Sequence, residues 1–451
     1  MSISRLLRSS RVAAVAVAVG AGLTLIGAVP HAADAAAAAE GVDCLAGAGG
    51  TSTFDLTARS GFILTPDGNT IYSWGFAGAS GAFQLPGPTL CVTAGETVTV
   101  VLHNTLKVPT SIVFPGQVGV EADGQPAAPQ FTSTAAGSLV QAVAGKTGTP
   151  IPSITYTFVA GQPGSYLYES GTDQRLQKQM GLYGALVVRP TGHDDWVYDD
   201  AATRFATPAN STYGYRQEYL QILSEVDPVI HLAVERNRAV NWSAYKPRYF
   251  LINGRAMPDT LAPNGAPYLP AQPYGATVHI RDAVGNPLPA VIRYLNAGPV
   301  TYPFHPHGNS QKVIGRDGRE LTSTPGSSTA PSANGTDLGY DKFLIEVGPG
   351  QTVDTTLTWT NVENWNPTTG QIKTPLPNQA DLGITGDTWW SQSPYLGFTS
   401  ELPAGVTSYN TCGEYYHVAH SHALQQSTNF GAAFGGMMTL IRIDPSTPVG
   451  C

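Results

Sequence analysis

The feature of this sequence that most constrains its fold is a two-residue alternation of apolar and polar side chains. In TVTVVLHN (97–104), Val98, Val100 and Leu102 alternate with two threonines and a further valine. A period of two places one set of side chains on a single face of a β-strand, where it can be buried. Another short strand precedes this one across an Ala-Gly-Glu turn, so residues 86–106 predict a β-hairpin.

The same kind of pattern recurs along the chain, and no long stretch has helical periodicity. Residues 153–170 contain two alternating strands around a glycine-containing turn, and residues 181–190 supply an apolar closing strand. Further strands are predicted in five later segments, residues 219–226, 247–254, 290–298, 342–361 and 435–443. The sequence therefore predicts an all-β fold.

The composition agrees with short strands joined by many turns. Of 451 residues, 50 are Gly and 35 are Pro, and only 12% are charged. The length suits two or three domains. The formal net charge of −8 argues against a nucleic-acid partner.

A polar, irregular stretch over residues 191–214 divides the chain. We interpret it as a linker between a first domain, residues 45–190, and a second domain, residues 215–451. The second domain carries long turn-rich insertions at 323–339 and 363–383, which we expect to be surface loops.

Residues 1–36 have the organisation of a signal peptide. Three arginines form a basic start, an apolar run follows over residues 12–29, and small residues surround a cleavage position near Ala35. The alternative is a retained membrane anchor, because the run approaches spanning length. The alanine-rich exit favours cleavage. We therefore expect a protein that is secreted, extracellular or in the cell envelope, with no membrane attachment after cleavage.

Four cysteines lie beyond the predicted cleavage position, and an even number in an exported chain indicates two disulfides. Three pairings are open. The pairs Cys44–Cys91 and Cys412–Cys451 are favoured because each keeps the bridge within one predicted domain.

Two H-x-H steps are the strongest chemical signal. His305 and His307 lie in YPFHPHGNS, and His420 and His422 lie in YHVAHSHAL. With 10 histidines in the chain, chance gives about 0.2 such steps. On a strand, both imidazoles of a step face the same side, and neutral imidazoles suit copper, zinc or iron. The alternative is that these histidines only form hydrogen bonds in the core.

Four landmarks occur in order along the chain. They are PGPTL with AGETVTVVLHN, GSYLYESGTDQRLQKQMGLYGALVV, YFLINGRAMPDT with IRYLNAGPVTYPFHPHG, and EYYHVAHSH with GGMM. Together they resemble the two-domain, laccase-like members of the multicopper oxidase family over nearly all of the mature chain. The resemblance implies two cupredoxin-like Greek-key β-sandwich domains.

The resemblance also implies copper chemistry. A type 1 copper, held by a Cys thiolate, two His and usually a Met, takes electrons from the substrate. Four H-x-H pairs hold a trinuclear copper cluster that reduces dioxygen. Two of those pairs match His305, His307, His420 and His422, while the first-domain positions carry other residues, namely Val113, Pro115, Glu169 and Gly171.

The type 1 positions are also changed. The resemblance places Tyr302, Ser421 and Gln426 where the family has His, Cys and His, and it places Met437 or Met438 at the axial position. A serine hydroxyl stays protonated at ordinary pH and cannot replace a soft thiolate. We therefore expect no type 1 copper.

The retained histidines predict a site for one metal ion, copper by resemblance. His305, His307, His420 and His422 suffice if they converge. Glu169 occupies a former cluster position and would add a carboxylate, and such a mixed set would also suit iron, manganese or zinc. The alternative for Glu169 is a solvated or hydrogen-bonded acid in a former cavity.

Two functions follow from these residues. The first is an exported, multicopper-oxidase-like protein that binds one copper ion, acting as an oxidoreductase on a small phenol or a metal ion. The alternative is a non-catalytic cupredoxin scaffold, with an extracellular binding or envelope-structural role, because the thiolate and all first-domain ligands are lost. A third possibility is an ordinary laccase in which the ligand positions are assigned wrongly here. Such a protein would be intensely blue.

The sequence leaves open whether the chain is an enzyme. Two-domain relatives form trimers with the copper cluster between subunits, so a homotrimer is an expectation from resemblance. The loss of the first-domain ligands removes one reason for that assembly.

Overall fold

The computed structural model describes residues 41–45, 47, 51–78, 81–131, 137–210, 216–281, 288–308, 310–324, 332–359, 373–374, 408–409, 415–431 and 435–444. The predicted signal peptide, Cys412, Cys451 and most of the insertion at 363–383 lie outside these residues. Over the described ranges, no helix combines the length and the apolar character needed to cross a membrane.

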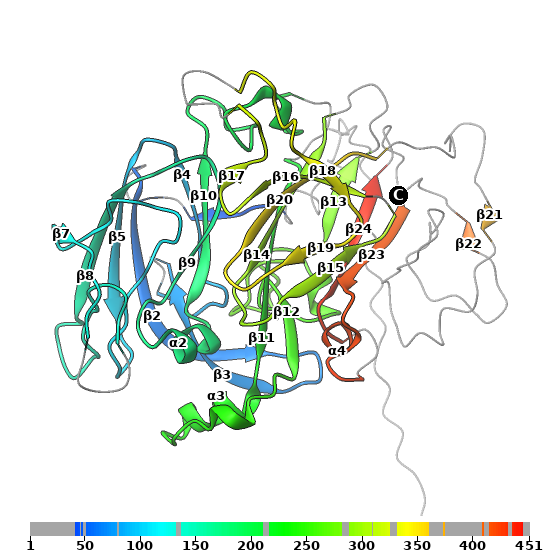
Figure 1. The fold of residues 1–451 in the computed structure, drawn as a ribbon. Coiled ribbons are helices and arrows are strands. Elements are labelled where there is room, and N and C mark those ends of the chain that lie inside the picture. The colour runs from blue at the N-terminus through cyan, green and yellow to red at the C-terminus, as the bar shows by residue number, and fades with distance from the viewer. Residues whose placement is uncertain are drawn as a thin grey trace, which may run out of the picture.

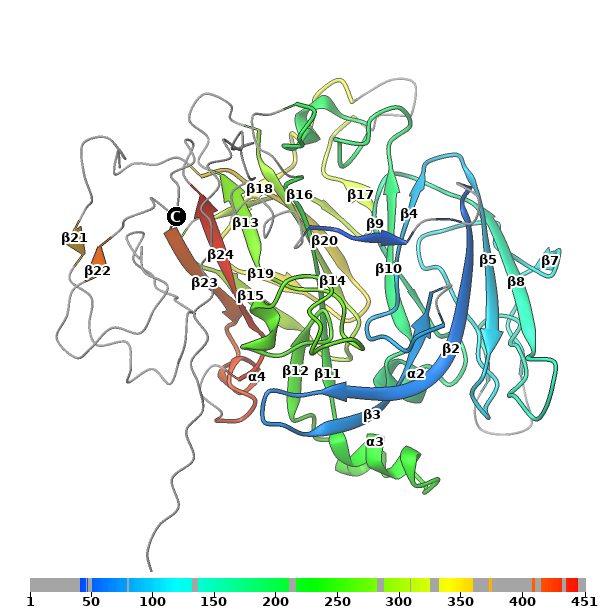
Figure 2. The ribbon, with the colours of Figure 1, turned by 180° about the vertical axis from the view of Figure 1, so that it is seen from behind.

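The first part of the chain is a sandwich of two β-sheets (Figures 1 and 2). The outer sheet contains β2 (Thr53–Leu64), β3 (Thr70–Ala77), β5 (Thr97–Asn104), β6 (Glu121–Ala122), β7 (Gln125–Pro126) and β8 (Ser153–Val159). The inner sheet contains β1 (Cys44–Leu45), β4 (Thr89–Thr93), β9 (Gly164–Glu169) and β10 (Tyr183–Arg189). Their orders are β3-β2-β5-β8-β6-β7 and β1-β4-β10-β9.

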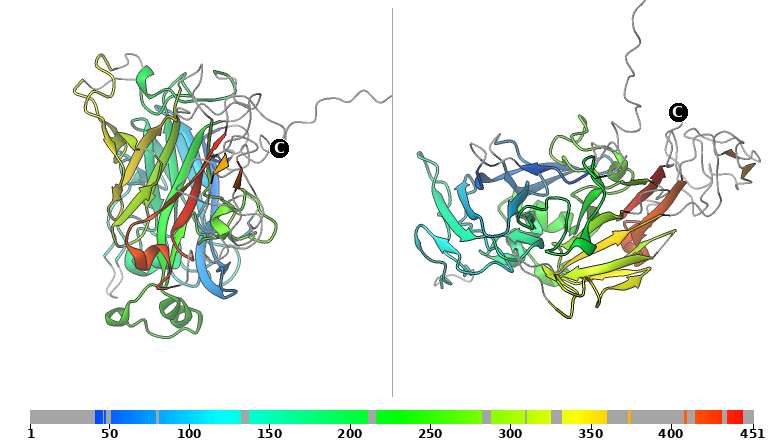
Figure 3. Two further views of the ribbon diagram at one scale, coloured as in Figure 1. Left: turned by 90° about the vertical axis from the view of Figure 1, so that its right-hand side faces the viewer. Right: turned by 90° about the horizontal axis from the view of Figure 1, so that it is seen from above.

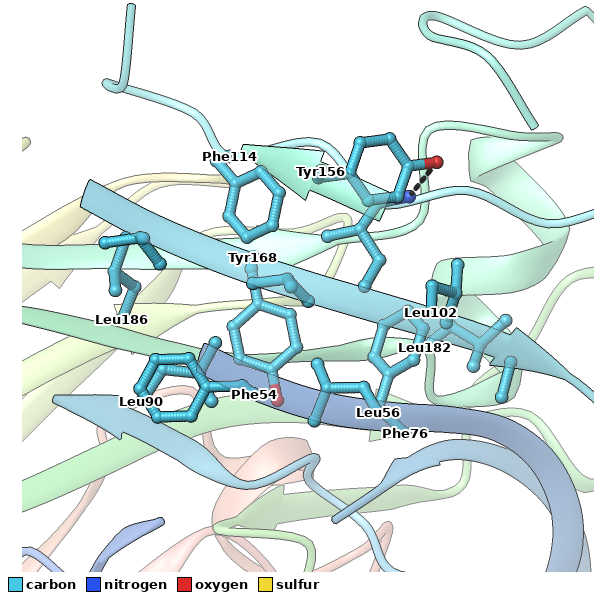
Figure 4. Close-up of a cluster of buried hydrophobic side chains, with 14 of the residues drawn as sticks. Phe54, Leu56, Phe76, Leu90, Leu102, Phe114, Tyr156, Tyr168, Leu182 and Leu186 are labelled. Carbon is cyan, nitrogen blue, oxygen red and sulfur yellow. Dashed lines mark hydrogen bonds between the residues drawn. The ribbon is translucent and has the colours of Figure 1, made fainter. Parts of the chain in front are cut away.

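The predicted alternation in β5 forms part of the first core. Val98, Val100 and Leu102 are fully buried, and the residues between them are more exposed. Aromatic rings fill the space between the sheets, and the ring centres of Phe114 and Tyr168 lie 6.5 Å apart (Figure 4). Burial of this apolar face stabilises the sandwich.

The β-hairpin predicted for residues 86–106 is wrong. β4 pairs with β1 and β10 in the inner sheet, whereas β5 pairs with β2 and β8 in the outer sheet. The chain crosses the sandwich at Gly95, whose φ of 83° suits a glycine. A similar crossing separates β8 from β9. Alternation shows which face of a strand is buried, but it does not show which strand lies beside it.

The second part of the chain is another sandwich, and the all-β prediction is confirmed. One sheet contains β11 (Glu218–Val226), β12 (Tyr249–Ile252), β14 (Ala290–Asn296), β16 (Gln311–Arg316), β17 (Arg319–Glu320), β18 (Tyr340–Lys342) and β20 (Thr352–Leu357). The facing sheet contains β13 (Val278–Arg281), β15 (Tyr302–Pro306), β19 (Ile345–Val347), β23 (Tyr415–Ser421) and β24 (Met438–Asp444). The orders are β12-β11-β14-β20-β16-β17, with β18 beside β16, and β13-β24-β23-β15-β19.

The remaining elements are short. β21 (Lys373–Thr374) pairs with β22 (Ser408–Tyr409). The helices are α2 (Gln174–Met180), α3 (Pro228–Glu235) and α4 (Leu424–Ser427), with single 3₁₀ turns η2 (Ala201–Thr203), η3 (Trp242–Ala244) and η4 (Asp259–Leu261). Seen from above, the first sandwich and the sheet that contains β23 and β24 lie at opposite ends of the molecule (Figure 3).

The predicted disulfide Cys44–Cys91 is confirmed. It joins β1 to β4, and its Cα atoms are 5.6 Å apart. The other predicted pair, Cys412–Cys451, lies outside the described residues.

The two sandwiches are joined through a shared apolar core. Leu167 and Ala185 from the first sandwich pack with Leu220, Ile222 and Leu295 from the second. Every residue of β9 and β11 is buried, because these strands are covered on both faces.

A buried ionic network crosses the same junction. A guanidinium nitrogen of Arg293, on β14, lies 2.7 Å from Glu218, and another lies 3.4 Å from Asp354. The Ser165 hydroxyl, from the first sandwich, donates to Asp354 and accepts from Arg293. Burial opposes the ionisation of Glu218, but Arg189 and Arg293 hold its pKa well below the usual range. The network therefore keeps its charges paired within the core.

Replacing Arg293 by Ala should destabilise the protein strongly, because the buried Asp354 would lose its basic partner and the buried Glu218 would lose one of its arginines. We expect a loss of about 3–5 kcal/mol in the free energy of unfolding, measured by urea denaturation. Arg204→Ala, which removes a more exposed pair with Asp195, should cost less than about 1 kcal/mol. Equal effects of the two substitutions would contradict the role given to the network.

Candidate metal centre

Strand pairing brings the two H-x-H steps together. β15 and β23 run antiparallel, with His305 directly opposite His420. The two-residue alternation then places His307 and His422 on the same side of the sheet as this pair. Neither step could have revealed this register by itself, because the strands are separated by more than one hundred residues of chain.

The four imidazole rings form what we call the histidine cluster. The ring centre of His305 lies 4.4 Å from His307, 5.8 Å from His420 and 5.3 Å from His422. The ring centre of His420 lies 5.1 Å from His307 and 5.8 Å from His422. The structure thus assembles all four histidines that the sequence singled out.

Hydrogen bonds orient three of the rings. His305 Nδ1 is 2.6 Å from the carbonyl oxygen of Phe343, and His420 Nδ1 is 2.8 Å from that of Ser421. A carbonyl only accepts, so each Nδ1 carries a proton and each neutral ring keeps its lone pair on Nε2. His420 Nε2 lies 3.0 Å from His307 Nε2, which therefore donates.

The electrostatics favour the neutral, metal-binding form of His420. Partial burial lowers the pKa of His420, and the neighbouring His305 and His422 lower it further. Yet within the described ranges no three His, Cys, Asp or Glu side chains are already arranged to hold a metal ion. The cluster gathers suitable donors, and their nitrogen atoms would need to turn toward a shared ion.

The opposite face of these strands holds the residues at the type 1 positions. Ser421 is fully buried, and its hydroxyl donates to the side-chain carbonyl of Gln426 on α4. The Tyr302 hydroxyl, also buried, donates to Glu225 over 3.1 Å. Met437 is buried in the core. Internal hydrogen bonds and packing therefore occupy the place of a copper ligand set.

A fifth histidine, His417, lies on β23 close to the cluster. It is buried against Trp359, with the ring centres 4.7 Å apart. Burial, and to a lesser extent His307, lowers the pKa of His417 to about 4. A Cβ atom at Gly308 would come within 2.6 Å of the His417 ring. The glycine after the first H-x-H step therefore allows the two strands to approach.

Glu169 is placed apart from the histidine cluster in the sheet topology. It ends β9 in the inner sheet of the first sandwich, and its carboxylate lies 2.6 Å from Lys178 Nζ on α2. This ion pair agrees with the alternative interpretation of a partnered acid in the protein interior. A ligand role for Glu169 stays a prediction.

A pocket of about 300 Å³ lies where the two sandwiches meet, and the sequence analysis missed it. Its walls come from α2, β10, β11 and η3, and they include Arg175, Glu225, Trp242 and Tyr245. Arg175 stacks over Trp242 at 4.2 Å. Burial raises the pKa of Glu225, which accepts hydrogen bonds from two tyrosines. No local motif signals this site, because its residues meet only after folding.

Comparison with known proteins shows a likeness over part of the chain. Residues 66–193 match the family model described as multicopper oxidase. This part of the chain is similar to a multicopper oxidase domain. The resemblance drawn from the sequence landmarks is therefore confirmed.

The same likeness extends to solved structures. The blue copper oxidase from Nitrosomonas europaea aligns with a TM-score of 0.52 and 17% identity, over 87% of this chain and 85% of that chain. At this identity the likeness shows the fold, and the fold is that of the multicopper oxidases.

Two curated relatives match shorter stretches. A probable nitrite reductase-hydroxylamine oxidoreductase fusion protein from Kuenenia stuttgartiensis is 30% identical over 165 residues, which cover 34% of this chain and 17% of that protein. An L-ascorbate oxidase from Brassica rapa subsp. pekinensis is 32% identical over 105 residues, 23% of this chain and 16% of that protein. The chain thus spans only a small part of the length of either relative.

The inner face of β15 and β23, opposite the histidine cluster, carries the residues at the type 1 positions and predicts an optical property. Copper-loaded wild-type protein should lack intense blue absorption, because Ser421 supplies no thiolate. The triple variant Ser421→Cys, Tyr302→His and Gln426→His should gain a blue band, whereas Ser421→Cys alone should not. Visible absorption spectroscopy tests this. A blue wild-type protein would show that the ligand positions are assigned wrongly.

Proposed function

We propose that this chain is an exported multicopper-oxidase-like protein that binds one copper ion through His305, His307, His420 and His422. The observation that supports the proposal is the convergence of four imidazoles from two paired strands. Nitrogen ligands of this kind suit copper. Export rests on the signal-peptide pattern of residues 1–36.

Hydrogen bonds would orient the histidines for the metal ion. The carbonyl oxygens of Phe343 and Ser421 hold the Nδ1 protons of His305 and His420, and so direct both Nε2 lone pairs away from the backbone. The proton between His307 and His420 is the one that a metal ion would displace. Bound copper would supply one-electron redox chemistry.

An oxidoreductase activity on a small phenol or a metal ion belongs to this proposal. The histidine cluster is partly exposed, so a substrate in solution can reach it. The substrate would pass electrons directly to the histidine cluster. The thiolate that would carry them at a type 1 site has no counterpart here, because Ser421 stands at that position and is hydrogen-bonded to Gln426. A homotrimer is part of the proposal by resemblance.

Copper content tests the proposal. Mature protein loaded with copper and dialysed should retain about one ion per chain, and His305→Ala with His420→Ala should reduce this below about 0.2 because half of the donors are lost. His103→Ala, which removes a histidine paired with Asp55, is the matched control. Metal content of about 0.2 or less in wild type and double variant alike would refute copper binding here.

The pocket between the sandwiches favours a second candidate, a non-catalytic binding protein. Trp242 and Tyr245 offer aromatic surface, Arg175 offers a positive charge, and Glu225 is a buried hydrogen-bonding group. Aromatic walls with a few polar groups suit a small phenol or aromatic acid. This role needs no metal.

The second candidate predicts binding of 4-hydroxybenzoate by metal-free protein, measured by isothermal titration calorimetry. Trp242→Ala should weaken binding by about tenfold or more, because ring stacking and the Arg175 contact are lost. Trp196→Ala, at a tryptophan that stacks on His193 instead, should leave the affinity unchanged. Absence of binding to the wild type would leave the pocket without this role.

A further inference from the structure

We propose that Asp200 and Glu320 form the core of a calcium-binding site that fastens the segment between the two sandwiches to the second sandwich. The site is independent of the histidine cluster. It uses oxygen donors, whereas the cluster offers nitrogen.

The connecting segment is firmly packed where the two acids meet. Val197, Tyr198 and Phe205 are buried against Val291 and Ile314 of the second sandwich. Asp200 follows directly as the N-cap of η2, and Glu320 ends β17. The two carboxyl groups therefore come from elements that are far apart in the sequence but fixed in space.

One oxygen of Asp200 has a structural task and the other has none. Asp200 Oδ1 accepts a hydrogen bond from the Ala202 backbone over 2.9 Å. Asp200 Oδ2 is buried, and no described N–H or hydroxyl group donates to it. The residue as a whole is only 4% exposed. A buried carboxylate oxygen without a donor is costly unless a cation satisfies it.

Glu320 lies beside Asp200, and one of its carboxylate oxygens also lacks a hydrogen-bond donor in the described chain. Its carboxyl group lies within hydrogen-bond reach of Asp200, and its Oε1 is also buried without a donor among the described residues. Burial, followed by the hydrogen bond to Asp200 and then by the charges of Asp200, Asp199 and Asp337, raises the pKa of Glu320 to about 8. Across the part of the chain that the structure describes, neither Asp200 nor Glu320 forms an ion pair with Lys, Arg or His.

The surroundings favour calcium over other cations. Two carboxylates are enough for Ca²⁺, which completes a shell of about six to eight oxygens with backbone carbonyls and water. Gly335 comes close to Asp200 Oδ2, because a Cβ atom at this glycine would lie 3.1 Å from it. Carboxylates from two separate elements suit the flexible geometry of Ca²⁺ better than the octahedral demand of Mg²⁺.

The competing explanation is a proton shared between the two carboxyl groups. A shared proton would satisfy both oxygens without a metal ion, and the raised pKa of Glu320 is compatible with it. The two explanations differ in their response to added calcium.

The test uses the full mature chain, treated with a chelator and then dialysed. Isothermal titration with CaCl₂ should show one site with a Kd of about 1 mM or tighter. Excess CaCl₂ should raise the midpoint of thermal unfolding by about 2 °C or more, and MgCl₂ should have a smaller effect.

Two near-isosteric variants identify the residues. Asp200→Asn keeps an oxygen for the η2 cap, and Glu320→Gln gives Asp200 a hydrogen-bond donor, so both should fold. Each should lose the response to CaCl₂. Asp194→Asn, on the same segment and largely exposed, should keep it. The His305→Ala and His420→Ala double variant should also keep it, which separates this site from the copper proposal.

Three outcomes would overturn the calcium site. One is wild-type protein that neither binds Ca²⁺ nor gains stability from it, which would leave the shared proton as the explanation. Another is a calcium response that persists in both Asp200→Asn and Glu320→Gln. The last is an equal response to MgCl₂, which would assign the effect to general charge screening.

Discussion

The antiparallel pairing of β15 with β23 is the interaction on which the histidine cluster depends. Its register sets His305 opposite His420 and Phe304 opposite Ser421. Because side chains alternate, one register assigns every residue of both strands to a face. A slip of one residue would turn the histidines into the core and the serine outward, so the buried face of the sandwich also protects the histidine cluster.

The two faces of this strand pair carry different kinds of residue. The outer face carries four imidazoles, and backbone carbonyl oxygens hold the rings of His305 and His420. The inner face, at the positions that resemble type 1 ligands, carries groups that satisfy each other, with Ser421 bonded to Gln426 and Tyr302 bonded to Glu225. A buried hydroxyl that has a partner costs little, whereas an abandoned ligand would leave an unpaired polar group in the core. The residues present at these positions are thus compatible with a stable fold.

The junction between the sandwiches contains a buried ion-pair network and a pocket. Glu218, Arg293 and Asp354 are paired there, and the pocket lined by Glu225 and Trp242 opens nearby in the same junction. The acids Asp200 and Glu320 are placed differently, because they have no basic partner in the described chain. That contrast is what distinguishes a structural ion-pair network from a cation site.

The sequence by itself determined the all-β fold, the resemblance to the multicopper oxidases and the four histidines. These follow from local pattern, since alternation marks a buried face and an H-x-H step marks two imidazoles on one side. It also indicated the Cys44–Cys91 bridge, although it left other pairings open. It failed for residues 86–106, because the turn at Gly95 leads into the other sheet instead of back along the same one.

Only the tertiary structure decided which strands lie side by side. That choice brought His305 to His420, paired Glu169 with Lys178, and joined Asp200 to Glu320. Long-range pairing depends on the packing of the whole sheet and on which polar groups find partners when it forms. No short stretch of this chain contains that information.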